Sequence, residues 1–213
     1  MPMRGDESPE VIYQAVGAAL TAWEGAEARL ARIFALIVGT DAHNVPAHRA
    51  YGSVASFNGR QDLLIAAVEG FMGALPNKKA RDRYELAHAN VLALAKRMKE
   101  FSARRNEIGH GAVGPYHVQV GQRFEKTYLL LPADYATRKQ ELAGAVKSKG
   151  KQFGLTVPKY GYNTEQINLF CEHFRSLHIE AQHVAMTWDH LRNLPNRQKP
   201  SPGRNRPPRA ARS

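Results

Sequence analysis

The chain has 213 residues, with 30 Lys and Arg against 19 Asp and Glu, and a net charge of +11. This length allows one domain with a real core, and a single cysteine, Cys171, excludes a disulfide framework and a cysteine-based zinc site. No apolar run approaches the roughly 18 residues of a membrane helix, and residues 1–10 lack the apolar segment of a signal peptide. We therefore expect a cytoplasmic protein without membrane attachment, metal or cofactor.

Two helical segments are predicted between residues 8 and 75. Ser8-Pro9 is a typical helix start, and Gly39 is a typical residue beyond a helix end. Between them, steps of three and four connect Leu20, Trp23, Glu27, Leu30, Phe34 and Ile37. A second helix is predicted over residues 46–75 as one uninterrupted segment, ended by Pro76.

Two further helices complete the helical pattern. The third is predicted over residues 78–110, and its apolar stripe reaches Arg105 and Ile108 near its end. The fourth begins after Asn163, where Gln166 is a capping-box partner, and its repeat indicates an end near Pro195. Long helices joined by short loops favour an antiparallel bundle.

The segment 111–163 interrupts this pattern. Alternation over residues 116–120 and an extended run over 126–131 predict a β-hairpin, followed by a short helix over 136–146 and a loop over 147–151. The expected fold class is therefore all-α, an antiparallel four-helix bundle with a small β-hairpin-containing insertion before the last helix.

The insertion and the C-terminal tail are rich in positive charge. The insertion interleaves aromatic with basic residues, and those expected to contact RNA are Arg138, Lys139, Lys147, Lys149 and Lys151. The alternative is a surface hairpin whose aromatic residues cover the bundle. Residues 195–213 predict a disordered basic tail, which either attracts nucleic acid or is only a solvated terminus.

Three side chains near the end of the third helix form a candidate catalytic site. Arg105 offers a fixed cation for a phosphate, His110 can exchange a proton near neutral pH, and Asn106 can position either of them. Cleaving RNA without a metal needs a base, an acid and a stabilising charge. Two alternatives stay open: an internal ion pair between Arg105 and Glu27, or a histidine favoured merely by a glycine-rich helix end.

The run Arg105-Asn106-Glu107-Ile108-Gly109-His110 resembles the R-x4-6-H motif of the HEPN (higher eukaryote and prokaryote nucleotide-binding) superfamily. The asparagine after the arginine and the glycine at position 111 are usual there. The layout, a long helix with the motif and then a closing helix, is similar to uncharacterised bacterial branches over residues 9–110 and 163–194. Residues 1–194 would form the HEPN-like domain, with the insertion 111–163 and the tail outside the resemblance.

The resemblance implies a metal-independent endoribonuclease. Active HEPN proteins are often toxins or antiviral effectors, and they are usually homodimers that bring two Arg–His sets into one cleft. Arg105 would bind the scissile phosphate, His110 would act as general base or acid in 2′-OH transesterification, Asn106 would orient one of them, and Glu27 would support the site. The expected partners are RNA, a second copy of the chain, and an antitoxin or defence-system protein. The alternative is a catalytically silent HEPN module that binds RNA or a protein.

Overall fold

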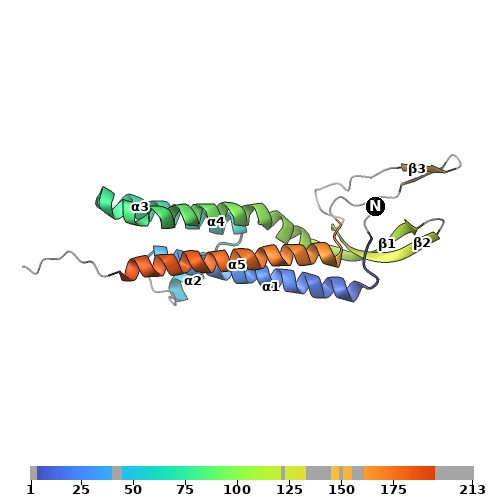
Figure 1. The fold of residues 1–213 in the computed structure, drawn as a ribbon, viewed down its shortest axis with the longest axis horizontal. Helices are drawn as coiled ribbons and strands as arrows, with labels where there is room; N and C mark the ends of the chain where they lie inside the picture. The colour runs from blue at the N-terminus through green and yellow to red at the C-terminus, as the bar shows by residue number, and fades with distance from the viewer. Residues whose placement is uncertain are drawn as a thin grey trace, which may run out of the picture.

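The computed structural model describes residues 4–39, 45–120, 123–132, 145–148, 151–154 and 161–194, and the basic tail 195–213 lies outside them. Within these ranges there are five helices, α1 (Pro9–Ile37), α2 (Val45–Gly52), α3 (Phe57–Ala74), α4 (Lys78–His110) and α5 (Thr164–Asn193) (Figure 1). Two antiparallel hairpins, β1 (Ala112–Val120) with β2 (Arg123–Leu131) and β3 (Ala145–Ser148) with β4 (Lys151–Gly154), separate α4 from α5 in the chain. The prediction of a mostly helical chain with a hairpin before the last helix is confirmed.

Local signals set the ends of the long helices. Gly39, just beyond α1, has a φ of 91°, a left-handed conformation that glycine adopts without strain. At the start of α4, Asn77 accepts a hydrogen bond from the backbone N–H of Ala80 at 2.9 Å. At the start of α5, Asn163 and Gln166 form the capping box, each accepting from the other's backbone N–H at 3.0 and 3.1 Å. The predicted positions of these three helices are thereby confirmed.

The prediction of one helix over residues 46–75 is wrong, because the chain breaks between α2 and α3. The side chain of Ser56 accepts a hydrogen bond from the N–H of Gly59 at 3.0 Å and caps α3. In addition, Arg60 donates from Nε to the carbonyl of Val54 at 2.8 Å, which holds the turn against the new helix. Serine side chains compete with backbone hydrogen bonds in this way, so a helical periodicity does not guarantee continuity.

The break at residues 53–56 alters the helix directions, so the expectation of a wholly antiparallel bundle is also wrong. The start of α1 lies beside the start of α5, where Asp6 accepts from the N–H of Thr164 at 2.7 Å. Further along both helices, the rings of Trp23 and Phe174 lie 5.2 Å apart. Helices α1 and α5 therefore run parallel, as Figure 1 shows.

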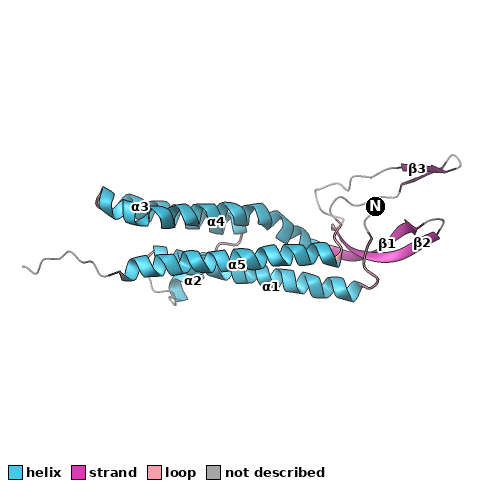
Figure 2. Ribbon diagram, viewed as in Figure 1, coloured by secondary structure: helices cyan, strands magenta, loops and turns pink. Residues whose placement is uncertain are grey.

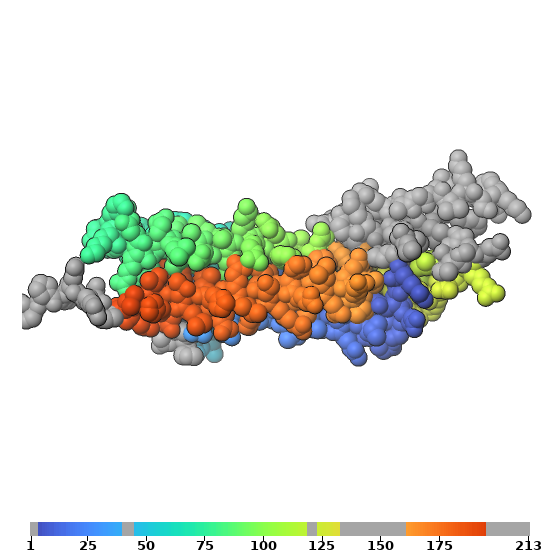
Figure 3. Space-filling model, in the orientation of Figure 1, coloured from blue at the N-terminus to red at the C-terminus, as the bar shows by residue number. Residues whose placement is uncertain are grey.

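Helix α4 runs in the opposite direction and closes the core. Tyr84, near its start, contacts Trp188 near the end of α5, with ring centroids 5.5 Å apart. Phe101, near its end, lies 6.3 Å from Phe174. Trp188 and Phe174 are fully buried, and Cys171 is only 2% exposed, so this cysteine is a small core residue. Figure 3 shows α4 and α5 side by side along one elongated face.

The β1–β2 hairpin is attached to the bundle by backbone hydrogen bonds. Asp6 and Tyr128 exchange two of them, at 2.9 and 2.8 Å, and Leu130 and Tyr162 exchange two more at 2.9 Å. The hairpin therefore extends from the end of the bundle where α4 ends and α5 begins (Figure 2).

Two further predictions fall in the second half of the insertion. The short helix over 136–146 lies mostly outside the described residues, and its last two positions belong to β3. Residues 147, 148 and 151 are in strands rather than in the predicted loop. None of the helices in the described ranges combines the length and the apolar character needed to cross a membrane.

Candidate functional site

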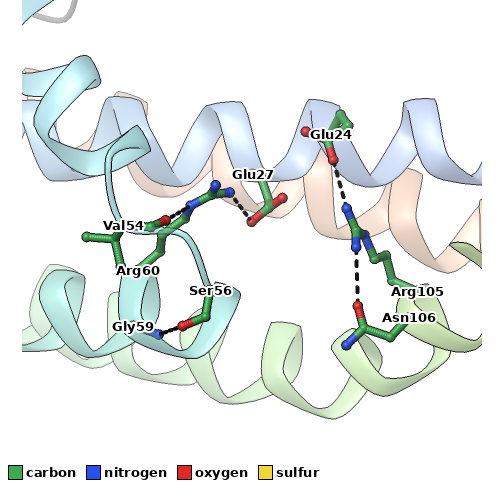
Figure 4. Close-up of polar contacts among 8 residues, drawn as sticks. All are labelled: Glu24, Glu27, Val54, Ser56, Gly59, Arg60, Arg105 and Asn106. Atoms are coloured by element: carbon green, nitrogen blue, oxygen red, sulfur yellow. Dashed lines mark hydrogen bonds and ion pairs between the residues drawn. The ribbon is translucent and has the colours of Figure 1, made fainter. Parts of the chain in front are cut away.

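Arg105 lies on the side of α4 that faces α1. Its Nη2 is 3.3 Å from Oε1 of Glu24, and its Nη1 donates to Oδ1 of Asn106 at 3.2 Å (Figure 4). The Arg105 side chain is 31% exposed and that of Glu24 is 62% exposed, whereas Nε of Arg105 is buried and has no hydrogen-bond partner in the part of the chain that the structure describes. The guanidinium is thus oriented by two weak contacts at the protein surface.

The alternative of an internal ion pair between Arg105 and Glu27 is wrong, because Glu27 pairs with Arg60. The Oε1 of Glu27 lies 3.1 Å from Nη1 of Arg60, and only 7% of the Glu27 side chain is exposed. Arg60 comes from the first turn of α3, and the break before α3 brings it opposite Glu27. Figure 4 shows the two ion pairs next to each other, since Glu24 and Glu27 are one turn apart on α1.

The two ion pairs share one polar cavity of about 380 Å³ between α1, the start of α3 and α4. The polar side chains that line it are Glu24, Glu27, Ser56, Asn58, Arg60, Ser102, Arg105 and Asn106, with Trp23 and Phe57 forming part of the wall. Its two arginines and two glutamates cancel in formal charge, while its hydroxyls and amides can donate and accept hydrogen bonds. This volume and lining suit a small polar group of a ligand.

A buried tyrosine, Tyr51, interacts electrostatically with the Glu27–Arg60 pair of this cavity. The hydroxyl of Tyr51 has no hydrogen-bond partner among the described residues, and the residue is 2% exposed. Burial, and then the negative charge of Glu27, raise the pKa of Tyr51 well above its usual value, and the charge of Arg60 opposes this only in part. The surroundings of the Arg60–Glu27 pair are therefore poorly solvated.

His110 does not line the cavity. It is the last residue of α4, it is exposed, and it follows Asn106 by four residues, which places it about 6 Å further along the helix axis. Gly111 behind it lies tightly against the hairpin, because a Cβ added there would approach Leu130 to 2.8 Å and the carbonyl of Glu107 to 3.0 Å. The structure thus brings Arg105 and Asn106 together, and it leaves His110 one helical turn away at the helix end.

The end of α4 is fixed by a polar cluster on another face. The Oε2 of Glu107 accepts from the hydroxyl of Tyr162 and from Arg104, each at 2.5 Å. Burial and the hydrogen bond to Glu107 raise the pKa of Tyr162 to about 12, and the same carboxylate raises the pKa of Arg104. This cluster joins α4 to the residue before the cap of α5, so it holds the segment that carries His110.

The RNA-binding residues predicted in the insertion are not placed by the structure. Arg138, Lys139 and Lys149 lie outside the described residues, and only the backbone is described at Lys147 and Lys151. In the first hairpin, Phe124 is 62% exposed, while Tyr128 packs against the core beneath Lys126, whose Nζ is 5.2 Å from the ring centroid. In the first hairpin, therefore, one aromatic residue is exposed and another covers the core.

Glu24, Arg60, Asn58 and Ser102 were missed as cavity residues at the sequence level. Arg60 and Asn58 reach the cavity because of the break before α3, for which Ser53 and Ser56 were the available signals, whereas Glu24 and Ser102 depend on the packing of α1 against α4. Among the described residues, no group of three or more His, Cys, Asp and Glu side chains is arranged to hold a metal ion. No family model, no curated protein and no solved structure matches this chain.

Proposed function

We propose that this protein is a metal-independent endoribonuclease of the HEPN type. In this proposal Arg105 binds the scissile phosphate and stabilises its developing charge, Asn106 orients the arginine, and His110 transfers a proton. The observation that carries the proposal is the joint position of Arg105 and Asn106, hydrogen-bonded to each other at 3.2 Å on a polar cavity, with His110 one turn further along the same helix.

The proposed reaction is an internal transesterification. The 2′-oxygen of the ribose loses its proton to a base and attacks the neighbouring phosphorus, and the bond from phosphorus to the 5′-oxygen breaks. The leaving oxygen takes a proton from an acid, so the products are a 2′,3′-cyclic phosphate and a 5′-hydroxyl. The protonated base then gives its proton to water and the deprotonated acid takes one from water, which restores both groups for the next cleavage.

Two protonating groups are needed, whereas the motif supplies one histidine in each chain. A homodimer with a two-fold axis near the ends of the two α4 helices would juxtapose two copies of His110. The position of His110 at the exposed end of α4, outside the cavity of its own chain, is compatible with use by a second chain. We therefore include a homodimer in the proposal.

The basic residues outside the bundle complete the proposal. Arg138, Lys139, Lys147, Lys149 and Lys151, with the basic tail, would attract single-stranded RNA through its phosphates. A toxin or anti-phage effector in the cytoplasm, held in check by an antitoxin or a defence-system partner, is the physiological role that follows from the HEPN resemblance.

A catalytically silent HEPN module that binds RNA or a protein is the second candidate. It is favoured by the engagement of Arg105 with Glu24 and by the separation of His110 from the cavity. In such a module the arginine would be a structural or binding group, and the chain would bind RNA without cleaving it.

Cleavage of end-labelled single-stranded RNA in the presence of EDTA separates the two candidates. The ribonuclease should produce 2′,3′-cyclic phosphate ends, and His110→Ala should reduce the rate by about 10²–10⁴ while RNA binding persists. A matched control is His183→Ala, because His183 is an exposed histidine of α5 outside the motif. Intact RNA with the wild-type protein, or full activity of His110→Ala, would overturn the ribonuclease.

A further inference from the structure

The two ion pairs on the cavity differ in how deeply their carboxylates are buried. The side chain of Glu24 is 62% exposed and approaches Arg105 at 3.3 Å, whereas that of Glu27 is 7% exposed and approaches Arg60 at 3.1 Å. Both carboxylates come from α1, and both arginines line the same cavity (Figure 4). A carboxylate at the surface can rotate into water at little cost, while a buried one loses its partner without gaining hydration.

Arg60 is bound more firmly than Arg105. Besides its ion pair, Arg60 donates from Nε to the carbonyl of Val54 at 2.8 Å, so its guanidinium is held on two sides. Arg105 has one contact with Glu24 and one with the neighbouring Asn106, and within the described ranges its Nε has no hydrogen-bond partner. Of the two arginines on the cavity, Arg105 is therefore the one whose carboxylate can be exchanged for another anion.

We propose that Glu24 is a competitor built into the site: its carboxylate holds Arg105 in the free protein and leaves when the phosphodiester of a nucleic acid binds. A phosphodiester and a carboxylate each carry one negative charge and offer two oxygens to a guanidinium, so they compete for the same donors. Asn106 keeps its contact with Arg105 during the exchange, and the Arg60–Glu27 pair stays in place as the fixed side of the cavity. This inference rests on the proposed function only in taking Arg105 as the phosphate-binding residue.

The exchange has a consequence for affinity. Each bound phosphate must replace the Glu24 carboxylate, and the two anions repel each other while both are near Arg105. Because an exposed ion pair is worth up to about 1 kcal/mol, removing the Glu24 charge should raise the affinity for a phosphodiester by about three- to five-fold. If Glu24 instead served to orient Arg105 for phosphate, its removal would lower the affinity.

The probe is a deoxyuridine dinucleotide, which has one phosphodiester and no 2′-hydroxyl, so it binds without being cleaved. Its dissociation constant is measured by NMR titration on the full chain for wild type, Glu24→Gln, Arg105→Gln and the double variant. Glu85→Gln is the charge-matched control. Glu85 is exposed and lies on α4, the helix that carries Arg105, about 30 Å from Arg105 along the helix axis. A urea unfolding curve of each variant verifies that it is folded.

The expected result is a three- to five-fold tighter dissociation constant for Glu24→Gln, no change for Glu85→Gln, and no gain from Glu24→Gln when Arg105 is already glutamine. An unchanged or weaker affinity of Glu24→Gln refutes the competitor. It is also refuted if neither the wild type nor Glu24→Gln binds the dinucleotide. A gain that persists in the double variant refutes it too, because the charge would then act without Arg105. Cleavage of RNA is measured separately: an inactive wild type with the expected binding pattern would refute the ribonuclease alone.

Discussion

Replacing Arg60 should destabilise the protein far more than replacing Arg105, although both arginines line the same cavity. Arg60→Ala leaves the carboxylate of Glu27 in surroundings where only 7% of its side chain meets water, and it removes the hydrogen bond to the carbonyl of Val54. Arg105→Ala leaves Glu24, which is already 62% exposed and becomes hydrated at once. The two changes remove the same chemical group, so the burial of the partner decides the difference.

The magnitudes follow from this contrast. Breaking a buried ion pair by removing one partner costs about 3–5 kcal/mol, and we expect about 3 kcal/mol for Arg60→Ala. The lower end applies because the Arg60 side chain is 25% exposed, so water reaches the stranded carboxylate from that side. Losing an exposed pair costs at most about 1 kcal/mol, which sets the expectation for Arg105→Ala.

Urea unfolding followed by circular dichroism measures both free energies of unfolding. The double variant Arg60→Ala with Glu27→Gln serves as the control, because it removes the stranded charge and should recover part of the loss. Equal losses for the two arginine variants would refute the reasoning, as would a double variant less stable than Arg60→Ala alone. The expected outcome also makes Arg105→Ala a sound test of cleavage, since its inactivity would not arise from unfolding.

Three further predictions concern other parts of the chain. Because the pKa of Tyr162 is raised to about 12 in the folded state, the contribution of this tyrosine to stability is complete below about pH 10 and is lost as the pH rises through about 12. Urea unfolding between these pH values should therefore show a smaller loss of stability for Tyr162→Phe than for the wild type. Gly111→Ala should cost about 1–3 kcal/mol in the same assay, because its Cβ would lie 2.8 Å from Leu130, and an unchanged stability would contradict the close approach. Light scattering should give twice the chain mass of 23.7 kDa, and a monomer at micromolar concentration would count against the homodimer.

The sequence by itself determined where most helices begin and end. These ends depend on contacts within a few residues, which can be predicted from the neighbouring amino acids. The examples are Ser8-Pro9, Gly39, Asn77 and the Asn163–Gln166 capping box. The β1–β2 hairpin was likewise predicted from the alternation over residues 116–120 and the extended run over residues 126–131. The prediction of one helix over residues 46–75 failed because it followed the helical periodicity alone. The side chains of Ser53 and Ser56 bind the backbone at the end of α2 and at the start of α3, and the helix is interrupted there.

Only the tertiary structure decided which arginine meets which glutamate. The pattern on α1 and α4 left open a pair between Arg105 and Glu27, but the reversal at residues 53–56 brings Arg60 to Glu27, and Arg105 pairs with Glu24. Likewise, the parallel course of α1 and α5 follows from that reversal and from the path through α4 and the hairpin. These partners are 33 and 81 residues apart in the chain, and packing selects them, because burial of the long apolar stripes fixes how the helices lie and hence which charged side chains meet.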